Sequence, residues 1–190
     1  MFIKNWKKEI LTIPNMLSLF RLALIPVYMD IYLRATDRYQ YFAAGIILAV
    51  SCLTDALDGW IARRFDMIST VGKILDPLAD KLTQFTLTLC LSLKYPALVP
   101  VLALFIVKEF FQVVAGIIHL RRGKILPGAL MAGKVCTAVL FVSLTAMVIM
   151  PTMDPRIVDI IAFADGLFLI VSFVNYGFVY MGKSGTMQDL

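Results

Sequence analysis

Long apolar segments dominate the chain and limit what it can fold into. Six stretches of mostly apolar residues are separated by short polar or proline-containing breaks. A helix needs about 20 such residues to cross the hydrocarbon core of a bilayer. The expected spans are residues 15–34, 41–63, 73–93, 97–120, 129–150 and 157–181. We therefore predict an all-α, polytopic membrane protein with six transmembrane helices, forming a single domain over residues 1–190.

The overall composition excludes an ordinary soluble protein. Hydrophobic residues make up 60% of the chain, whereas soluble globular proteins contain roughly 45–50% apolar residues. A soluble helical protein of 190 residues would have too little interior to hide so many apolar side chains. The three cysteines lie inside apolar segments without paired spacing, which indicates packing residues rather than disulfides or a zinc site.

The basic residues predict how the chain lies in the membrane. Residues 1–11 contain Lys4, Lys7 and Lys8 and lack the long apolar region of a cleaved signal, so they are expected to form a short interfacial amphipathic segment. The face of the termini would carry Lys4, Lys7, Lys8, Arg63, Arg64, Lys73, Arg121, Arg122, Lys124 and Lys183, and the opposite face Arg34, Arg38, Lys94 and Arg156.

This asymmetry places both termini on the cytoplasmic side, in what we expect to be a bacterial cell membrane. The net charge of +5 is explained by this topology and by attraction to anionic membrane lipids, without any nucleic acid partner.

Four acidic residues cluster where the second expected span ends and the third begins. Asp55 and Asp58 are three residues apart, and Asp76 and Asp80 are four apart, so each pair lies on one helix face. Each charge inside a membrane helix costs about 2.5–3.5 kcal/mol on insertion scales, and a bound divalent cation would offset that cost. Oxygen ligands favour magnesium or manganese. Pro77 leaves two readings open: Asp76 caps a helix, or Pro77 kinks a helix that begins nearer Ser69.

The neighbours of these aspartates have both functional and structural readings. Gly59 and Gly72 would let a ligand or a backbone approach closely, although small residues also serve helix packing. Arg63 could bind a phosphate or extend to the membrane interface.

Taken together, these residues resemble the signature of the CDP-alcohol phosphatidyltransferase family. The matching positions are Asp55, Asp58, Gly59, Ala62, Arg63, Gly72, Asp76 and Asp80. The resemblance implies a metal-dependent enzyme of phospholipid biosynthesis with a six-helix membrane fold. It implies transfer of a phosphatidyl group from CDP-diacylglycerol to an alcohol, with release of CMP.

The same resemblance implies roles for individual residues. The four aspartates would hold two divalent metal ions, Mg²⁺ or Mn²⁺, and Asp80 would also deprotonate the acceptor hydroxyl. Gly59, Ala62 and Gly72 would admit the cytidine, and Arg63 would lie near the nucleotide phosphates. Family members are often homodimers, so a homodimer is a further expectation.

The first expected span resembles one branch of the family, that of phosphatidylglycerophosphate synthases and CMP-forming cardiolipin synthases. The resemblance lies in residues 13–18, with Arg21 and Pro26. It suggests that Asn15 and Arg21 contact donor phosphates, although Asn15 could also cap the helix. Arg21 lies among apolar residues, where it needs an anionic partner.

Later residues leave the acceptor open. Lys108, followed by Glu109, and Lys134 are the candidate acceptor-binding cations, and both resemble positions of phosphatidylglycerophosphate synthases. Cys136 and Gly116 stand where that branch is expected to carry basic residues, and residues 134–139 look more like a cardiolipin synthase.

Glycerol 3-phosphate is the favoured acceptor and phosphatidylglycerol the alternative. A distant alternative is a non-enzymatic cation-transport or lipid-binding membrane protein, because acidic residues within membranes commonly mark ion pathways.

Overall fold

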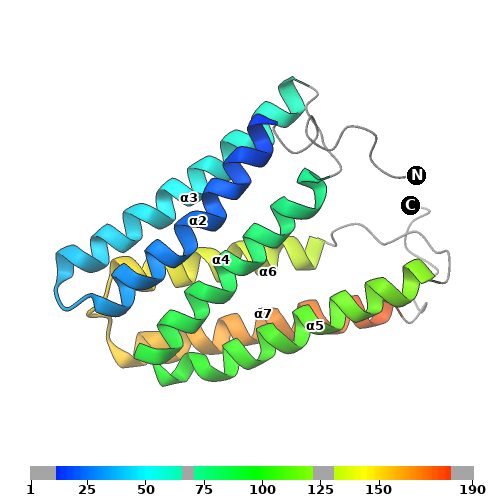
Figure 1. The fold of residues 1–190 in the computed structure, drawn as a ribbon. Coiled ribbons are helices and arrows are strands. Elements are labelled where there is room, and N and C mark those ends of the chain that lie inside the picture. The colour runs from blue at the N-terminus through cyan, green and yellow to red at the C-terminus, as the bar shows by residue number, and fades with distance from the viewer. Residues whose placement is uncertain (1–11, 66–70, 122–130, 181–190) are drawn as a thin grey trace. The chain divides into compact units, whose positions relative to one another are not determined.

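The computed structural model describes residues 12–65, 71–121 and 131–180. Six long helices fill these ranges (Figure 1). They are α2 (Ile13–Arg34), α3 (Arg38–Arg64), α4 (Gly72–Lys94), α5 (Val99–Arg121), α6 (Met131–Ile149) and α7 (Pro155–Tyr180), with a short 3₁₀ helix η1 (Pro96–Leu98) before α5. The all-α class is therefore confirmed, and each helix begins and ends within a few residues of an expected span. The predicted interfacial segment at residues 1–11 lies outside the described residues.

Three helices of the described ranges are long and apolar enough to cross a membrane. These segments are Ile13–Arg34, Pro96–His119 and Pro155–Tyr180, and Gly133–Ile149 is a shorter apolar helix. By composition the chain is thus a multi-pass integral membrane protein. Membrane crossing by α3, α4 and α6 stays a prediction, because charged residues lower the hydropathy of α3 and α4 and the apolar part of α6 is shorter.

Large apolar side chains on the outside of the helices agree with a lipid environment. Phe110 of α5 is 71% exposed and Phe163 of α7 is 76% exposed. At most 28% of the residues in the three apolar windows are buried inside the protein. Contiguous apolar surface of this kind is rare on a soluble monomer, whereas lipid tails cover it without cost.

The helices belong to two compact units. The first comprises residues 1–90 with 148–151, and the second comprises residues 91–147 with 152–190.

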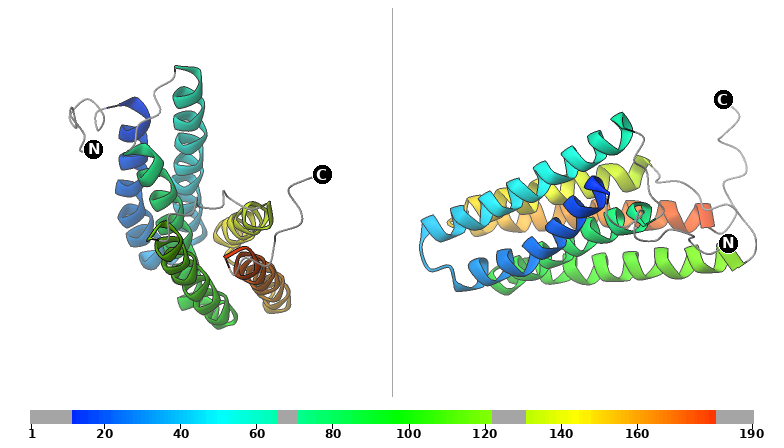
Figure 2. Two further views of the ribbon diagram at one scale, coloured as in Figure 1. Left: turned by 90° about the vertical axis from the view of Figure 1, so that its right-hand side faces the viewer. Right: turned by 45° about the horizontal axis from the view of Figure 1, so that its top comes forward.

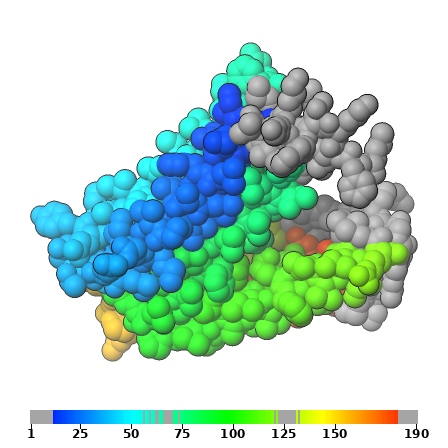
Figure 3. All heavy atoms as spheres, viewed as in Figure 1, coloured from blue at the N-terminus to red at the C-terminus, as the bar shows by residue number. Residues whose placement is uncertain are grey.

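The first unit is built on a hairpin of α2 and α3. The turn between them ends at Asp37, whose side chain accepts a hydrogen bond from the backbone N–H of Gln40, while the Gln40 side chain reaches back to Asp37. This capping box starts α3 sharply. Tyr32 of α2 then packs edge-on against Tyr41 of α3, with ring centroids 5.4 Å apart. The two helices lie side by side in all views (Figures 1 and 2), and their side chains are in contact on the face shown in Figure 3.

Helix α4 of the first unit settles the question raised by Pro77. The backbone N–H groups of Ile74 and Leu75 both bond the carbonyl of Val71, so the helix begins at Gly72 and continues through Pro77. Asp76 is therefore inside the helix rather than its cap. Pro77 falls in the second turn, where its missing N–H costs one hydrogen bond to the carbonyl four residues earlier.

The second unit pairs α5 with α7 and adds α6. Phe111 of α5 packs against Phe173 of α7 with ring centroids 5.0 Å apart. Ser143 of α6 donates a hydrogen bond of 2.7 Å to the buried carboxyl of Asp165 in α7. The half-buried hydroxyl of Ser143 thus satisfies the buried carboxyl of Asp165 across the helix contact.

Gly133 of α6 lies close to the Tyr176 side chain of α7, and we predict an effect on stability from this contact. A Cβ atom at Gly133 would lie 2.7 Å from the hydroxyl oxygen of Tyr176 and 2.9 Å from its ring, and Tyr176 is itself buried. We expect Gly133→Ala to displace that side chain and to destabilise the protein by about 1–3 kcal/mol. Gly166→Ala is the matched control, since its Cβ would meet Leu104 at an ordinary 3.9 Å. Thermal unfolding of both variants in detergent checks this, and equal midpoints would contradict it.

Candidate active site

One arginine of α2 lies among three aspartates of α3 and α4. The Nη2 atom of Arg21 is 2.5 Å from Oδ1 of Asp55 and 2.7 Å from Oδ2 of Asp58, and its Nη1 atom is 2.5 Å from Oδ1 of Asp80. The Arg21 side chain is only 2% exposed. Such charge-assisted hydrogen bonds are the strong ones in proteins, so Arg21 ties together the aspartates of two different helices. All these residues belong to the first unit.

The fourth aspartate is held by a serine one turn before Arg21. The Ser18 hydroxyl is 2.5 Å from Oδ1 of Asp76 and 3.4 Å from Oδ2 of Asp58. Ser18 is fully buried. The face of α2 that carries Ser18 and Arg21 therefore contacts all four carboxylates, which we call the acidic site.

Solvent reaches the four carboxylates unequally. The Asp55 and Asp80 side chains are 47% and 52% exposed, whereas Asp58 is 5% exposed. The acidic site thus has a buried side against α2 and an open side where a ligand could reach Asp55 and Asp80.

The charges of the acidic site do not balance. Arg21 contacts three of the carboxylates and the charge of Lys81 also acts on Asp80, so two positive charges face as many as four negative charges. Since like charges at these separations repel strongly, the site favours additional cations. Its donors are all oxygen atoms, which suit magnesium or manganese rather than zinc.

The donor chemistry of the acidic site therefore fits a divalent ion, but its present geometry is organised around Arg21. No group of three His, Cys, Asp or Glu side chains in the described residues is arranged as a ready metal site. Oxygens of Asp55, Asp58 and Asp80 that could bind a metal are bonded to the guanidinium instead.

The remaining predicted donor-binding residues lie near the four aspartates in the sequence. Asn15 is buried in the first turn of α2, and Gly72 is buried at the start of α4. Gly59, Ala62 and Arg63 lie in the last two turns of α3, just after Asp58. The side chains of these three positions lie outside the described part of the structure.

The two predicted acceptor-binding lysines belong to the second unit. Lys108 of α5 is 2% exposed, and its Nζ atom is 2.6 Å from the carboxylate of Glu109. Lys134 is exposed near the start of α6. Cys136, one of the positions that depart from the phosphatidylglycerophosphate synthase pattern, is buried at 1% exposure, so a lysine there would have to be buried too.

Sequence reasoning missed Ser18. A serine in an apolar helix commonly bonds its own backbone, and the Ser18 hydroxyl does lie 3.1 Å from the carbonyl of Pro14. Its spacing of three residues from Arg21 was the available signal, because that spacing puts both side chains on one helix face.

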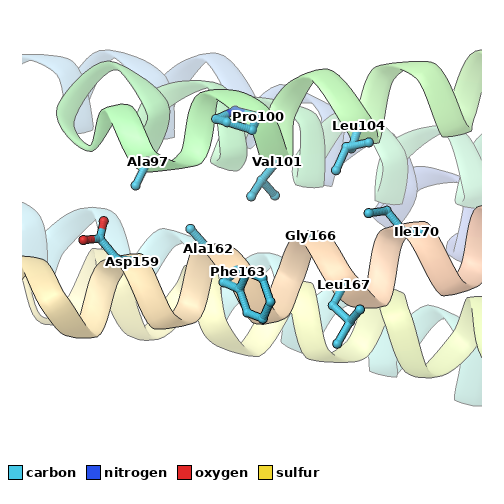
Figure 4. A pocket seen from close by; sticks show the side chains of 10 residues that line it. All are labelled: Ala97, Pro100, Val101, Leu104, Asp159, Ala162, Phe163, Gly166, Leu167 and Ile170. Atoms are coloured by element: carbon cyan, nitrogen blue, oxygen red, sulfur yellow. The ribbon is translucent and has the colours of Figure 1, made fainter.

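The second unit also contains an apolar groove between the η1–α5 segment and α7. Its volume is about 350 Å³. In Figure 4, Ala97, Val101 and Leu104 point toward α7, and Asp159 is the one charged side chain among the described residues of the lining. Such a groove suits apolar chains rather than a charged headgroup, so its chemistry differs from that of the acidic site.

Residues 11–175 match the profile of the CDP-alcohol phosphatidyltransferases. A CDP-diacylglycerol--glycerol-3-phosphate 3-phosphatidyltransferase of Aquifex aeolicus is 29% identical over 171 residues, covering 87% of this chain and 94% of that protein. A CMP-forming cardiolipin synthase of Streptomyces coelicolor is 35% identical over 138 residues, covering 68% of this chain and 61% of that protein. A cardiolipin synthase (CMP-forming) / mitochondrial hydrolase fusion protein of Schizosaccharomyces pombe is 39% identical over 89 residues, 46% of this chain but 14% of its own length.

The fold, the site and the profile match together define a class of protein. It is a helical, multi-pass membrane enzyme with a polar site on its first three described helices. The chain belongs to the CDP-alcohol phosphatidyltransferase family, whose members are generally metal-dependent.

The contacts of Arg21 predict its contribution to stability. Arg21→Gln would leave the buried Asp58 without its ionic partner, and breaking a buried ion pair costs about 3–5 kcal/mol. Because Asp55 and Asp80 are half exposed, we expect roughly 2–4 kcal/mol here. That corresponds to a fall of roughly 5–10 °C in the thermal midpoint in detergent without added metal.

Arg34→Gln is the control for this measurement, because Arg34 lies on the same helix in an exposed ion pair with Asp30. It should change the midpoint little. Equal effects of the two substitutions would show that the acidic site does not depend on Arg21.

Proposed function

We propose that this chain transfers a phosphatidyl group from CDP-diacylglycerol to glycerol 3-phosphate, releasing CMP, as a phosphatidylglycerophosphate synthase. The observation that carries the phosphatidyl transfer is the convergence of four carboxylates, from α3 and α4, on one face of α2. The choice of acceptor is supported by the Aquifex relative, because that match covers nearly the whole length of both chains.

Asp55, Asp58, Asp76 and Asp80 would hold two divalent metal ions, Mg²⁺ or Mn²⁺. When bound, the ions neutralise the charge of the donor's pyrophosphate and orient the reacting groups in line. The unbalanced negative charge and the all-oxygen donors of the acidic site support this assignment.

Asp80 is the proposed general base. Its side chain is half exposed on the open side of the acidic site, whereas Asp58 is buried. Asp80 would remove the proton from the acceptor hydroxyl as that oxygen forms its bond to the donor's diacylglycerol-linked phosphorus. The bond between that phosphorus and the oxygen bridging to CMP breaks in the same displacement, and CMP carries away the electron pair.

Donor binding is assigned to residues that flank the aspartates along the chain. They are Asn15, Arg21, Gly59, Ala62, Arg63 and Gly72. Arg21 would stay close to the pyrophosphate, since its guanidinium lies among the carboxylates that the phosphates must approach. Lys108 and Lys134 would bind the acceptor, their positive charges matching the phosphate of glycerol 3-phosphate.

The proposed membrane arrangement has six crossings, with both termini and the acidic site on the cytoplasmic side, following the distribution of basic residues. The acyl chains of the donor would stay in lipid while its headgroup meets the acceptor at the membrane boundary. A homodimer remains part of the proposal.

Substitution of Asp80 tests the assignment of the base. We expect Asp80→Asn to lower kcat by about 10²–10⁴-fold, the usual contribution of a general base. CMP release from CDP-diacylglycerol with saturating Mn²⁺ measures it. Asp30→Asn, an exposed carboxylate at the far end of α2, should retain full turnover. If Asp80→Asn also kept full turnover, the base would have to be another residue.

A second acceptor is favoured by specific observations. The Streptomyces relative is named a CMP-forming cardiolipin synthase, and Cys136 is a buried neutral residue where the phosphatidylglycerophosphate synthase pattern has a lysine. The alternative proposal is therefore transfer to phosphatidylglycerol, which would give cardiolipin.

Separate assays with the two acceptors distinguish these proposals. Purified protein in Mg²⁺ or Mn²⁺ receives CDP-diacylglycerol with either glycerol 3-phosphate or phosphatidylglycerol, and both CMP and the lipid product are measured. We expect CMP release that depends on glycerol 3-phosphate, with phosphatidylglycerophosphate as product. Release that depends only on phosphatidylglycerol would establish the alternative acceptor. No release with any alcohol would leave a cation-transport or lipid-binding protein.

A further inference from the structure

We propose that Ser18 is a positioning residue that orients the carboxylate of Asp76 for metal binding beside the other three aspartates of the acidic site. This inference rests on the proposed function, because it assumes that these aspartates bind divalent ions. It assigns a role to a residue outside the signature formed by the four aspartates with Gly59, Ala62, Arg63 and Gly72.

The hydrogen bonds of Ser18 single it out. Its hydroxyl has one proton and three acceptors within reach, namely the Pro14 carbonyl at 3.1 Å, Asp58 at 3.4 Å and Asp76 at 2.5 Å. The Pro14 carbonyl also accepts the helical backbone bond expected from four residues ahead, and it carries no net charge. The proton is therefore best placed on the charged and nearest acceptor, Asp76.

The Ser18 hydroxyl meets carboxylates of two other helices. Asp58 belongs to α3 and Asp76 to α4, whereas Ser18 belongs to α2. Within the described residues, Arg21 contacts Asp55, Asp58 and Asp80, while Asp76 is the aspartate that Ser18 holds. Ser18 thus sets where the Asp76 carboxylate lies relative to Asp58.

The burial of Ser18 makes its hydrogen bond a rigid support for the carboxylate. The Ser18 hydroxyl belongs to a residue that is 0% exposed, so water does not reach the donor side of the hydrogen bond to Asp76. A carboxylate with one oxygen held by a buried hydroxyl keeps its other oxygen in a fixed direction. Hydrogen-bond partners of this kind orient metal ligands, and their loss typically costs 10–100-fold in metal affinity.

Metal binding without donor or acceptor tests the proposal. Titration of the purified protein with Mn²⁺, followed by electron paramagnetic resonance of the free ion, gives the affinity directly. We expect Ser18→Ala to weaken Mn²⁺ binding by about 10–100-fold and Ser18→Thr, which keeps the hydroxyl, to stay within a few-fold of the unchanged protein. If the Mn²⁺ affinity falls in both variants, or in neither, the positioning role is wrong.

Two controls separate the possible failures. Ser172→Ala removes an equally buried hydroxyl of α7, one that has no hydrogen-bond partner among the described residues, and it should leave Mn²⁺ binding unchanged. Asp76→Asn should itself weaken binding strongly. If Asp76→Asn binds Mn²⁺ normally, the proposed metal site is wrong. If Asp76→Asn binds Mn²⁺ weakly while Ser18→Ala binds it normally, only the role of Ser18 is wrong.

Folding of each variant is checked by its thermal midpoint. Should Ser18→Ala not purify in folded form, Ser18→Cys replaces it, because a thiol is a weaker donor of similar size. An intermediate loss of Mn²⁺ affinity is then expected, and an unchanged affinity would again overturn the proposal.

Discussion

The contact between Arg21 and the aspartates of α3 and α4 is the interaction on which the first unit depends. Four carboxylates on two neighbouring helices repel one another, and inside apolar helices that repulsion is poorly screened. The guanidinium of Arg21 bonds three of them, and Ser18 bonds the fourth. Helix α2 therefore supplies both the cation and the hydroxyl that allow α3 and α4 to bring their acidic residues together.

The sequence predicted the parts of this arrangement that depend on local pattern. Apolar segments located all six helices, because length and hydropathy are local properties. The spacings of Asp55 with Asp58 and of Asp76 with Asp80 predicted two acidic helix faces. Which side chain of α2 meets those faces depends on tertiary packing, so the need of Arg21 for an anionic partner was foreseen but the contacts of Ser18 were not. The path of the chain through Pro77 likewise required the backbone hydrogen bonds.

The acceptor is harder to derive than the donor for a physical reason. Recognition of CDP-linked phosphates by aspartates and metal ions needs fixed spacings, whereas an acceptor phosphate needs only a positive charge within reach. Lys108 illustrates the difficulty, because its charge is already compensated by Glu109 within a buried pair. Lys134 is exposed and Cys136 is buried and neutral. These residues therefore discriminate weakly between glycerol 3-phosphate and phosphatidylglycerol, and the relatives are divided in the same way.

Charge also separates the role proposed for Arg21 from that proposed for Ser18. Arg21 and Lys81 together leave as many as two negative charges of the acidic site uncompensated, and two divalent ions would turn that imbalance into a positive excess. The phosphates of a donor would then restore neutrality, so that ions and donor each make the other's binding more favourable. Arg21 would gain the phosphates as partners when the ions take the carboxylates. Ser18 is uncharged and takes no part in this balance, which is why its effect should fall on the geometry of metal binding.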